Sequence, residues 1–168
     1  PVVMLAAKSD HARVRKMVTA RVELWDIPTD DLWCRDSGAI FVRNGAGDLA
    51  VRQIQVNGWG DKQLHGNDGL IAARMADRLG LPLLPSPLKG EAGAVEQDGH
   101  GLLIAHESSW VNDNRNPGMD RAGVEAALLE AYGANRMIWT PGLKDEDITD
   151  YHIDSLARLT GPARVLIN

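Results

Sequence analysis

Hydrophobic positions in the first part of the chain predict short strands and helices in alternation. Residues 2–7 form a continuous apolar run, which is typical of a buried strand. Ser9 can cap a helix over residues 10–20, and residues 21–27 alternate between polar and apolar as a half-buried strand does. Residues 28–38 follow neither period and combine charged side chains with bulky ones. We therefore expect a loop with a functional role there.

The next stretch predicts a hairpin, a helix and an edge strand. Residues 39–43 and 49–56 read as strands, and the Asn-Gly-Ala-Gly-Asp segment between them is typical of a hairpin turn. Asp68 is the expected cap of a helix that ends at Gly80. The apolar segment 81–88 contains three prolines, so we expect only a short strand or an extended edge there.

The same order of elements then follows once more. Residues 94–97 and 102–106 predict a second hairpin around an Asp-Gly turn. A long polar loop over residues 107–120 follows, then a helix that ends at Gly133, and then a strand over residues 136–140. A unit that recurs with helix starts near residues 10, 68 and 120 predicts a propeller or an array whose units complete one another's core.

Composition narrows the classes of protein and partner. The 168 residues suggest one compact domain, at roughly 150 residues per domain. A hydrophobic share of 44% and a single cysteine, Cys34, disfavour a disordered chain or a disulfide scaffold and fit a cytoplasmic protein. The net charge of -5 disfavours nucleic acid or an anionic membrane as partner and is compatible with a cationic ligand. No apolar run is long enough to predict a membrane span.

Three polar segments carry residue types suited to proton transfer and cation binding. His152 and Asp154 are two residues apart in a strand expected to start near Tyr151, so their side chains share one face. An imidazole beside a carboxylate suits acid–base catalysis near neutral pH. Asp36 and Asp154 can each accept two N–H bonds from a planar guanidinium. Glu91 can hold the histidine in one orientation.

Structural roles compete with each of these assignments. A His-x-Asp pair is often a satisfied core pair, and Asp36 beside Arg35 is compatible with a plain ion pair. Glu91 between glycines suits a solvated loop tip, and the run 144–150 suits a solvated acidic face. Cys34 is either a thiolate beside Arg35 or a small buried apolar residue.

A metal site is a further interpretation of the C-terminal polar segment. Oxygen and nitrogen ligands for magnesium, manganese or zinc are present in Asp147, Asp150, His152 and Asp154. The segment lacks the glycine position of a calcium-binding helix–loop–helix. The chain also has no Gly-x-Gly-x-x-Gly segment and no phosphate-binding loop that ends in Gly-Lys.

Six segments of the chain stand out as motifs: Asp31-Leu-Trp-Cys-Arg-Asp36-Ser-Gly-Ala-Ile-Phe-Val42, Asn57-Gly-Trp-Gly60, Glu91-Ala-Gly93, Asp98-Gly-His-Gly101, Asn114-Arg-Asn-Pro117 and Thr149-Asp-Tyr-His-Ile-Asp154. In this order and at similar spacing, they resemble the agmatine deiminase and bacterial peptidylarginine deiminase family of the pentein superfamily. The chain departs from the family pattern at Ala39, Ala92 and Tyr151, where the family has Pro, Gly and Gly.

The resemblance implies an α/β fold, a pentein-type propeller built of five ββαβ modules. Because the chain resembles only the central portion of the family, residues 1–168 are expected to be the central part of a single deiminase catalytic domain, without the family's N-terminal and C-terminal parts. The expected fold is an incomplete propeller of two to three modules. Such a piece exposes strand edges, so association with itself or with another chain is expected.

The resemblance also implies a reaction, the hydrolysis of a guanidinium to a ureido group and ammonia through a cysteine-bound intermediate, with no cofactor or metal. By the motif match, Asp36 and Asp154 would hold the guanidinium nitrogens. His152 would protonate the departing ammonia and then activate water, and Glu91 would orient His152. The expected substrate-binding residues are Asp36, Asp154, Trp33, Trp59 and Asp150.

The family's nucleophilic cysteine lies in a Gly-x-x-His-Cys segment near the C-terminus, and this chain ends at Asn168 before such a segment. Cys34 does not match that position, so the 168-residue chain by itself is expected to be inactive. For the parent protein we expect agmatine as the small guanidine substrate, converted to N-carbamoylputrescine in polyamine metabolism. The alternatives are a peptidylarginine deiminase and a guanidine-binding or interaction fragment without turnover.

Overall fold

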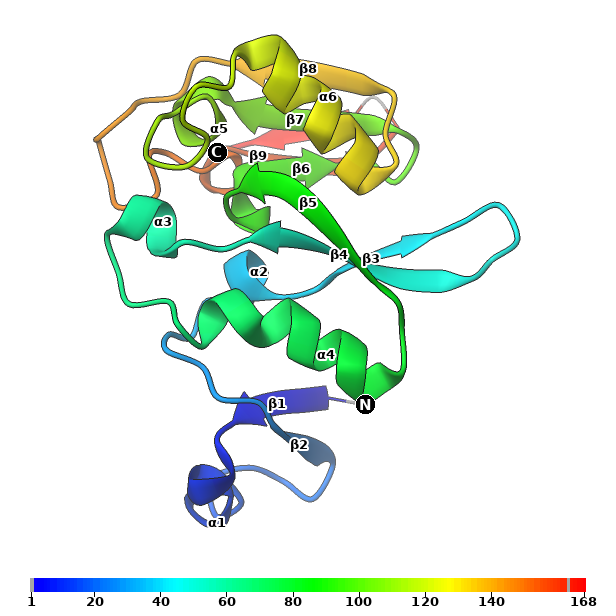
Figure 1. The fold of residues 1–168 in the computed structure, drawn as a ribbon, viewed down its shortest axis with the longest axis vertical. Coiled ribbons are helices and arrows are strands. Elements are labelled where there is room, and N and C mark those ends of the chain that lie inside the picture. Colours follow the sequence, from blue (N-terminus) through cyan, green and yellow to red (C-terminus); the bar gives the residue numbers. More distant parts are fainter. Residues whose placement is uncertain (1, 163) are drawn as a thin grey trace.

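The computed structural model of the protein describes residues 2–162 and 164–168 and has the alternating strands and helices that the hydrophobic pattern predicts (Figure 1). The strands of these residues form four small sheets, two with two strands and two with three. Each three-stranded sheet combines one antiparallel and one parallel strand pair. The architecture is therefore mixed α/β.

The N-terminal unit is a pair of parallel strands at one end of the molecule (Figure 1). Its elements are β1 (Val2–Ala6), η1 (Lys8–Asp10), α1 (His11–Val14) and β2 (Val22–Asp26). The helix expected over residues 10–20 is much shorter, and no side chain caps η1 or α1, that of Ser9 included. Neither element buries a residue. A helix without packing on one face has little to stabilise further turns.

The second unit is a three-stranded sheet with a helix across it (Figure 1). Its elements are β3 (Ile40–Arg43), β4 (Leu49–Gln55), η2 (Asp68–Leu70), α4 (Ile71–Leu79) and β5 (Leu83–Lys89). The predicted hairpin β3–β4 and the edge position of β5 are both confirmed. Asp68 does not cap the helix. Its carboxylate instead accepts the backbone N–H groups of Asp30 and Asp31, at 2.8 and 3.1 Å, which ties the loop before α4 to the 28–38 segment.

The third unit repeats the order of the second. Its elements are β6 (Val95–Gln97), β7 (Leu102–His106), α6 (Arg121–Tyr132) and β8 (Arg136–Thr140). The Asp120 carboxylate caps α6 by accepting the N–H of Gly123 at 2.8 Å, and Gly133 ends the helix with a φ of 63°. In both units the hairpin is antiparallel and the strand after the helix is parallel to its neighbour. The recurring unit predicted from the sequence is therefore confirmed.

Short helical turns occupy several connecting segments. They are α2 (Cys34–Ser37), α3 (Gly58–Asp61), η3 (Ala92–Ala94), α5 (Glu107–Trp110) and η4 (Ile153–Ser155). The strand expected from Tyr151 is wrong, because Asp150 and Tyr151 have φ values of 59° and 68° that a strand does not allow. The chain turns into η4 instead and continues into an unpredicted antiparallel hairpin, β9 (Ala157–Gly161) and β10 (Arg164–Ile167).

The main hydrophobic core joins α6 to the two three-stranded sheets. Its buried members are Ile54, Leu88, Ala94, Val95, Leu103, Ala105, Trp110, Val124 and Leu128. Trp110 is fully buried, and its indole Nε1 donates to the carbonyl of Ala94 at 2.9 Å. This packing fixes the end of β5 against the start of β6, which is the segment that carries Glu91 and Gly93.

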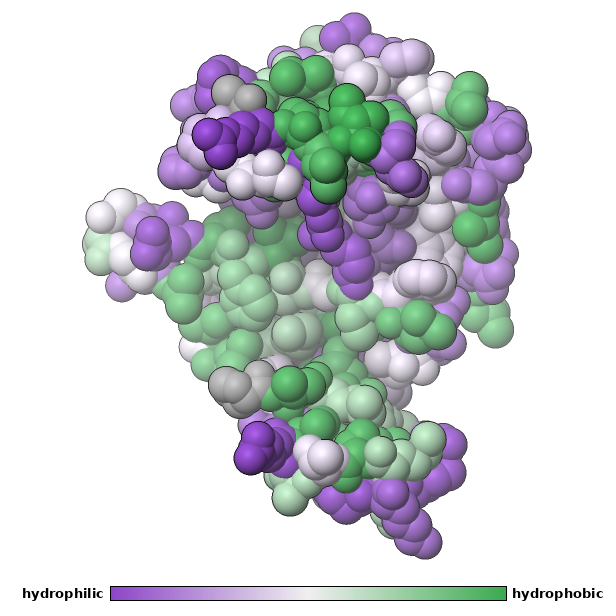
Figure 2. Space-filling model, turned by 180° about the vertical axis from the view of Figure 1, so that it is seen from behind, coloured by the Kyte–Doolittle hydropathy of each residue, from purple (hydrophilic) through white to green (hydrophobic). Residues whose placement is uncertain are grey.

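Hydrophobic side chains are also exposed near both ends of the chain. Val2 in β1 is 62% exposed, and Leu166 and Ile167 in β10 are 65% and 68% exposed. The view from behind shows hydrophobic residues across the middle of the molecule and in a patch near its upper end (Figure 2). Among the residues that the structure describes, no helix is both long and apolar enough to cross a membrane.

Candidate active site

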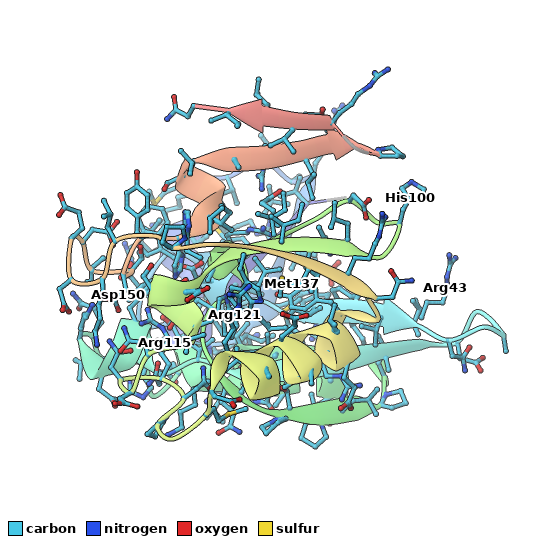
Figure 3. The ribbon with its side chains drawn as sticks, turned by 90° about the horizontal axis from the view of Figure 1, so that it is seen from above. Arg43, His100, Arg115, Arg121, Met137 and Asp150 are labelled. Carbon is cyan, nitrogen blue, oxygen red and sulfur yellow. The ribbon has the colours of Figure 1, made fainter. Side chains whose placement is uncertain are left out.

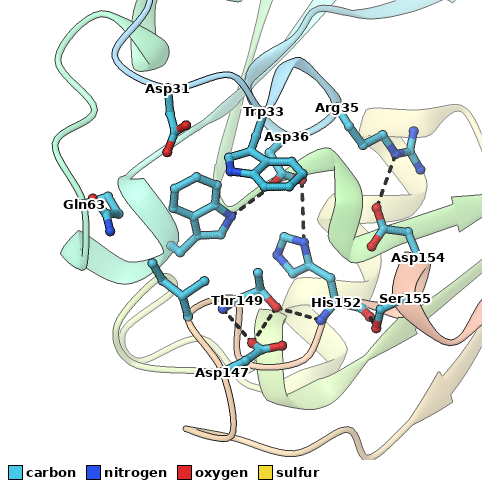
Figure 4. Close-up of a pocket in the computed structure, with 12 residues that line it drawn as sticks. Asp31, Trp33, Arg35, Asp36, Gln63, Asp147, Thr149, His152, Asp154 and Ser155 are labelled. Atoms are coloured by element: carbon cyan, nitrogen blue, oxygen red, sulfur yellow. Dashed lines mark hydrogen bonds and ion pairs between the residues drawn. The ribbon is translucent and has the colours of Figure 1, made fainter.

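Turns from separate units meet and line a cavity of about 400 Å³ (Figure 4). The turns are α2, α3 and the segment that leads into η4. The side chains that line the cavity are Asp31, Trp33, Arg35, Asp36, Trp59, Gln63, Asp147, Ile148, Thr149, His152, Asp154 and Ser155. Carboxylates and indole rings together suit a planar cation, which donates hydrogen bonds in its plane and stacks through its faces.

Asp36, on α2, is held in the cavity by two donors. The indole Nε1 of Trp59 donates to its Oδ2 at 3.0 Å, and the backbone N–H of Gly93 donates to its Oδ1 at 3.0 Å. The same Oδ1 is 3.6 Å from Nδ1 of His152. Burial raises the pKa of Asp36, although His152 and the Trp59 hydrogen bond act in the opposite direction. A desolvated carboxylate of this kind gains strongly from a cationic ligand.

Gly93 lies where three predicted site residues converge. A Cβ added to it would be 2.2 Å from Oδ1 of Asp36, 2.8 Å from Nδ1 of His152 and 3.0 Å from Oδ2 of Asp154. The three side chains therefore surround one small volume, although they come from distant parts of the sequence. Only a residue without a side chain leaves that volume undisturbed.

Glu91 lies against His152 from the protein interior and is itself fully buried. Its Oε2 is 3.3 Å from Nε2 of His152, and its Oε1 accepts the backbone N–H of Trp59 at 3.1 Å. Asp36 contacts the other ring nitrogen. Glu91 thus hydrogen-bonds Nε2 of His152, and Asp36 lies within ion-pair distance of Nδ1, so carboxylates flank the ring on both sides.

Asp154 lies near a cation of the protein itself. Nε of Arg35 is 3.8 Å from Oδ2 of Asp154 (Figure 4). Nη2 of Arg35 donates to Glu96 and to the carbonyl of Val95, both at 3.0 Å. The plain ion pair between Arg35 and its sequence neighbour Asp36 is therefore not formed. Sequence reasoning missed this role of Arg35, because a long side chain can reach partners on other strands.

Asp150 is the predicted substrate-binding residue that lies outside the cavity. Its side chain is fully buried, and its Oδ2 accepts hydrogen bonds from Arg115, Lys62 and Asn114 at 2.6, 2.9 and 3.0 Å. Burial alone would raise the pKa of Asp150, but these donors outweigh burial and lower it. Asp150 does not line the cavity, and its carboxylate is directed toward Arg115, Lys62 and Asn114 instead.

The two tryptophans both line the cavity but differ in exposure. Trp59 is 7% exposed and lies inside, where it holds Asp36. Trp33 is 55% exposed and stands at the opening. Tyr151, which replaces a glycine of the family pattern, does not line the cavity. Its ring lies 5.4 Å from the ring of the buried His106, so it leaves the cavity unobstructed.

A family model for Porphyromonas-type peptidyl-arginine deiminase matches residues 1–168. The chain belongs to this family. The agmatine deiminase and Porphyromonas-type peptidyl-arginine deiminase family consists of hydrolases that act on guanidino groups. The resemblance carried by the six sequence segments is thus confirmed.

Relatives of the chain within the deiminase family are about twice its length. A Streptomyces coelicolor protein with the name "Putative agmatine deiminase" is 34% identical over 174 residues, which cover 100% of this chain and 51% of that protein. The agmatine deiminase of Enterococcus faecalis, 21% identical, superposes with a TM-score of 0.92 over 99% of this chain and 47% of its own. A C. jejuni agmatine deiminase with substrate bound, 27% identical, superposes with a TM-score of 0.84 over 98% and 49%. The chain spans about half the length of the relatives it matches.

The structure does not support two interpretations that the sequence offered, a buried apolar Cys34 and a metal site in the C-terminal polar segment. Cys34 is exposed, so its interpretation as a small buried apolar residue is wrong, because α2 places it at the surface. It lines other hollows of the surface rather than the cavity that holds His152. Within residues 2–162 and 164–168, no group of three or more His, Cys, Asp or Glu side chains is arranged to hold a metal ion. The metal site considered for the C-terminal polar segment is not formed, since Asp150 points away from His152 into its own set of donors.

Proposed function

We propose that residues 1–168 form the guanidinium-binding and proton-transferring part of an amidinohydrolase that converts agmatine to N-carbamoylputrescine and ammonia. The observation that carries this proposal is the convergence of Asp36, His152 and Asp154 on one small volume above Gly93. A guanidinium carbon is a poor electrophile, so it needs carboxylates that hold it and an acid that protonates the departing nitrogen.

In this proposal Asp36 and Asp154 accept the N–H groups of the guanidinium from two sides. Each can form charge-assisted hydrogen bonds with a planar donor pair. Trp33 and Trp59 present ring faces to the flat cation and exclude water from it. These four residues then bind and orient the substrate in its ground state.

His152 acts as acid and then as base, and Glu91 orients its ring. A thiolate attacks the guanidinium carbon, and ammonia leaves with a proton from His152. Water then attacks the thiol-bound intermediate, gives a proton to His152 and releases the thiolate and the ureido product. The contacts of His152 with Asp36 and Glu91 keep the ring in place through both steps.

The thiol would come from outside residues 1–168. Cys34 is the sole cysteine of the chain, and it does not line the cavity. The relatives are about twice as long as this chain, which leaves room for a nucleophile in a further segment. We therefore expect residues 1–168 alone to bind a guanidine without turning it over.

Agmatine is favoured as substrate by the charges that line the cavity. Four lining side chains are carboxylates, Asp31, Asp36, Asp147 and Asp154, whereas Arg35 is the permanent cation among them. Agmatine carries a guanidinium and an amine, so both of its ends are attracted by this excess of negative charge. Peptidyl-arginine, which the description of the matching family model favours, is the second candidate.

The same proposal extends to the fold. The two ββαβ units would be consecutive modules of a pentein-type propeller, and residues 1–168 would be the central part of one deiminase catalytic domain. The parallel pair β1–β2 and the hairpin β9–β10 each contain part of such a unit. Exposed apolar residues on both pairs, such as Val2 and Ile167, suit packing against further modules.

Calorimetric titration of the 168-residue chain with agmatine tests the binding site. We expect binding that Asp36→Asn or Asp154→Asn weakens by at least about tenfold, since a hydrogen bond to a charged group contributes about 1.5–3 kcal/mol. Asp77→Asn is the matched control, because Asp77 is an exposed carboxylate on α4. Absence of binding would overturn the site assignment.

Ammonia release tests the reaction and the source of the thiol. Turnover by the 168-residue chain itself would refute a thiol outside it. In a longer protein that carries this sequence, faster turnover of a peptidyl-arginine than of agmatine would favour the second candidate. Binding without turnover there would leave a guanidine-binding protein and refute the hydrolase.

A further inference from the structure

Arg115 is a fully buried cation that joins two fully buried carboxylates. Its Nε donates to Oε2 of Glu91 at 2.9 Å, and its Nη1 donates to Oδ2 of Asp150 at 2.6 Å. Its Nη2 donates to the carbonyl of Thr149 at 3.1 Å. Figure 3 shows Arg115 and Asp150 together at one end of the molecule, away from the hairpin tip that carries Arg43. Arg115 does not line the cavity, so it has no direct contact with a ligand there.

A chain of contacts between charged side chains passes through Arg115 and reaches His152 in the cavity. From the partly exposed end to the cavity the members are Lys62, Asp150, Arg115, Glu91, His152 and Asp36. Isolated buried charges are strongly disfavoured, so each member depends on its neighbours. Glu91 is the link between the two halves, because its Oε2 contacts both Nε of Arg115 and Nε2 of His152.

We propose that Arg115 is a positioning residue that acts through Glu91 on His152. This inference rests on the proposed function, in which His152 transfers the protons. Without the guanidinium, the buried Glu91 carboxylate would lose its ion pair with Arg115 and would be free to turn away from His152. This change would alter how the imidazole is held, although Asp36 and Asp154 would still bind the substrate.

The geometry also explains why the residue is an arginine and what Asp150 does. A planar guanidinium reaches two carboxylates and a carbonyl in fixed directions, whereas a lysine ammonium cannot hold both carboxylates in that geometry. Asp150 and Thr149 anchor the far side of Arg115, which fixes the direction of its Nε toward Glu91. Asp150 thus supports the site by holding Arg115, although it does not line the cavity.

Steady-state kinetics of a longer protein that carries this sequence separate this role from substrate binding. Arg115→Met removes the charge, and we expect kcat to fall about 10- to 100-fold, as removal of supporting partners does at metal sites, while KM changes less than about twofold. Arg43→Met, at the exposed hairpin tip, is the matched control. If Arg115→Met leaves kcat unchanged, or raises KM alone, the inference is wrong.

A double-mutant cycle tests whether Arg115 acts through Glu91. We expect Arg115→Met to have almost no further effect on kcat in a Glu91→Gln background, because the partner it positions is already lost. Independent, additive losses would overturn the inference. Should Arg115→Met fail to fold, Arg115→Lys and Asp150→Asn test the same link, and both are expected to lower kcat more than they change KM.

A spectroscopic measurement on the 168-residue chain keeps this test separate from that of the proposed function. We expect Arg115→Met to shift the imidazole NMR signals of His152 and to leave those of the exposed His100 in place. In the Glu91→Gln background the further shift should vanish. Unchanged His152 signals would refute the inference even if the protein hydrolyses agmatine. Failure of a longer protein that carries this sequence and a further cysteine to turn over agmatine would instead refute the proposed function.

Discussion

Substitution of Gly93 by alanine perturbs the candidate site at a single point. The added methyl carbon would lie 2.2 Å from Oδ1 of Asp36, which is far inside van der Waals contact, and close to His152 and Asp154 as well. Gly93 has no positive φ, so alanine strains the backbone little and the effect is one of space. The side chains must move apart, and the hydrogen bond from the Gly93 N–H to Asp36 must lengthen.

The size of the effect follows from the carboxylate contacts that are displaced. Loss of one charge-assisted hydrogen bond to the guanidinium removes about 1.5–3 kcal/mol, which corresponds to about 10- to 150-fold in affinity. Calorimetric titration with agmatine measures this loss directly. The free energy of unfolding should also fall, by about 1–3 kcal/mol, since Gly93 is buried and the added methyl group overpacks the three side chains around it.

Gly45→Ala is the matched control for this substitution. Gly45 lies in the β3–β4 hairpin loop, where an added Cβ meets no atom within 4 Å and the φ is not positive. We expect its affinity for agmatine to equal that of the wild-type chain. If Gly93→Ala binds agmatine as tightly as Gly45→Ala does, the three side chains do not converge on the ligand and the proposed site is wrong.

Three further outcomes are expected. Trp110→Ala should lower the free energy of unfolding in urea by about 3–5 kcal/mol, because it empties a fully buried core position, and a loss below about 1 kcal/mol would contradict that packing. Because the folded-state pKa of Asp150 is lowered, the ionised side chain stabilises the fold fully above the ordinary carboxyl pKa, and this contribution declines as pH falls below about 4. The difference in free energy of unfolding between wild type and Asp150→Asn should therefore become smaller from pH 7 to pH 3. A difference that stays constant over this range would contradict the lowered pKa. Because burial raises the pKa of Asp36, the affinity for agmatine should start to decline on acidification at a pH above the ordinary aspartate pKa of about 3.9. Calorimetric titrations at a series of pH values measure this decline. Its absence would show that Asp36 does not hold the cation.

Local sequence patterns predicted most of the helices and strands that residues within the same segment stabilise. The β3–β4 hairpin follows from its turn residues, and α6 follows from its apolar spacing and its Gly133 stop. Where the cause is tertiary, the same reasoning failed. The helix after β1 is short because nothing packs on it, and Asp68 serves the neighbouring loop rather than its own helix.

The candidate site likewise has features that the sequence predicts and features that only the tertiary structure shows. Residue types indicate Asp36, Glu91, His152 and Asp154 as candidates, and the motif match to the deiminase family gives each of them an expected role. Their convergence above Gly93 and the inward turn of Asp150 come from positive φ values and contacts between distant segments. In the sequence, Arg115 is only one residue of a motif. Its partners Glu91 and Asp150 are 24 and 35 residues away, so only the folded chain could show that one buried guanidinium joins them.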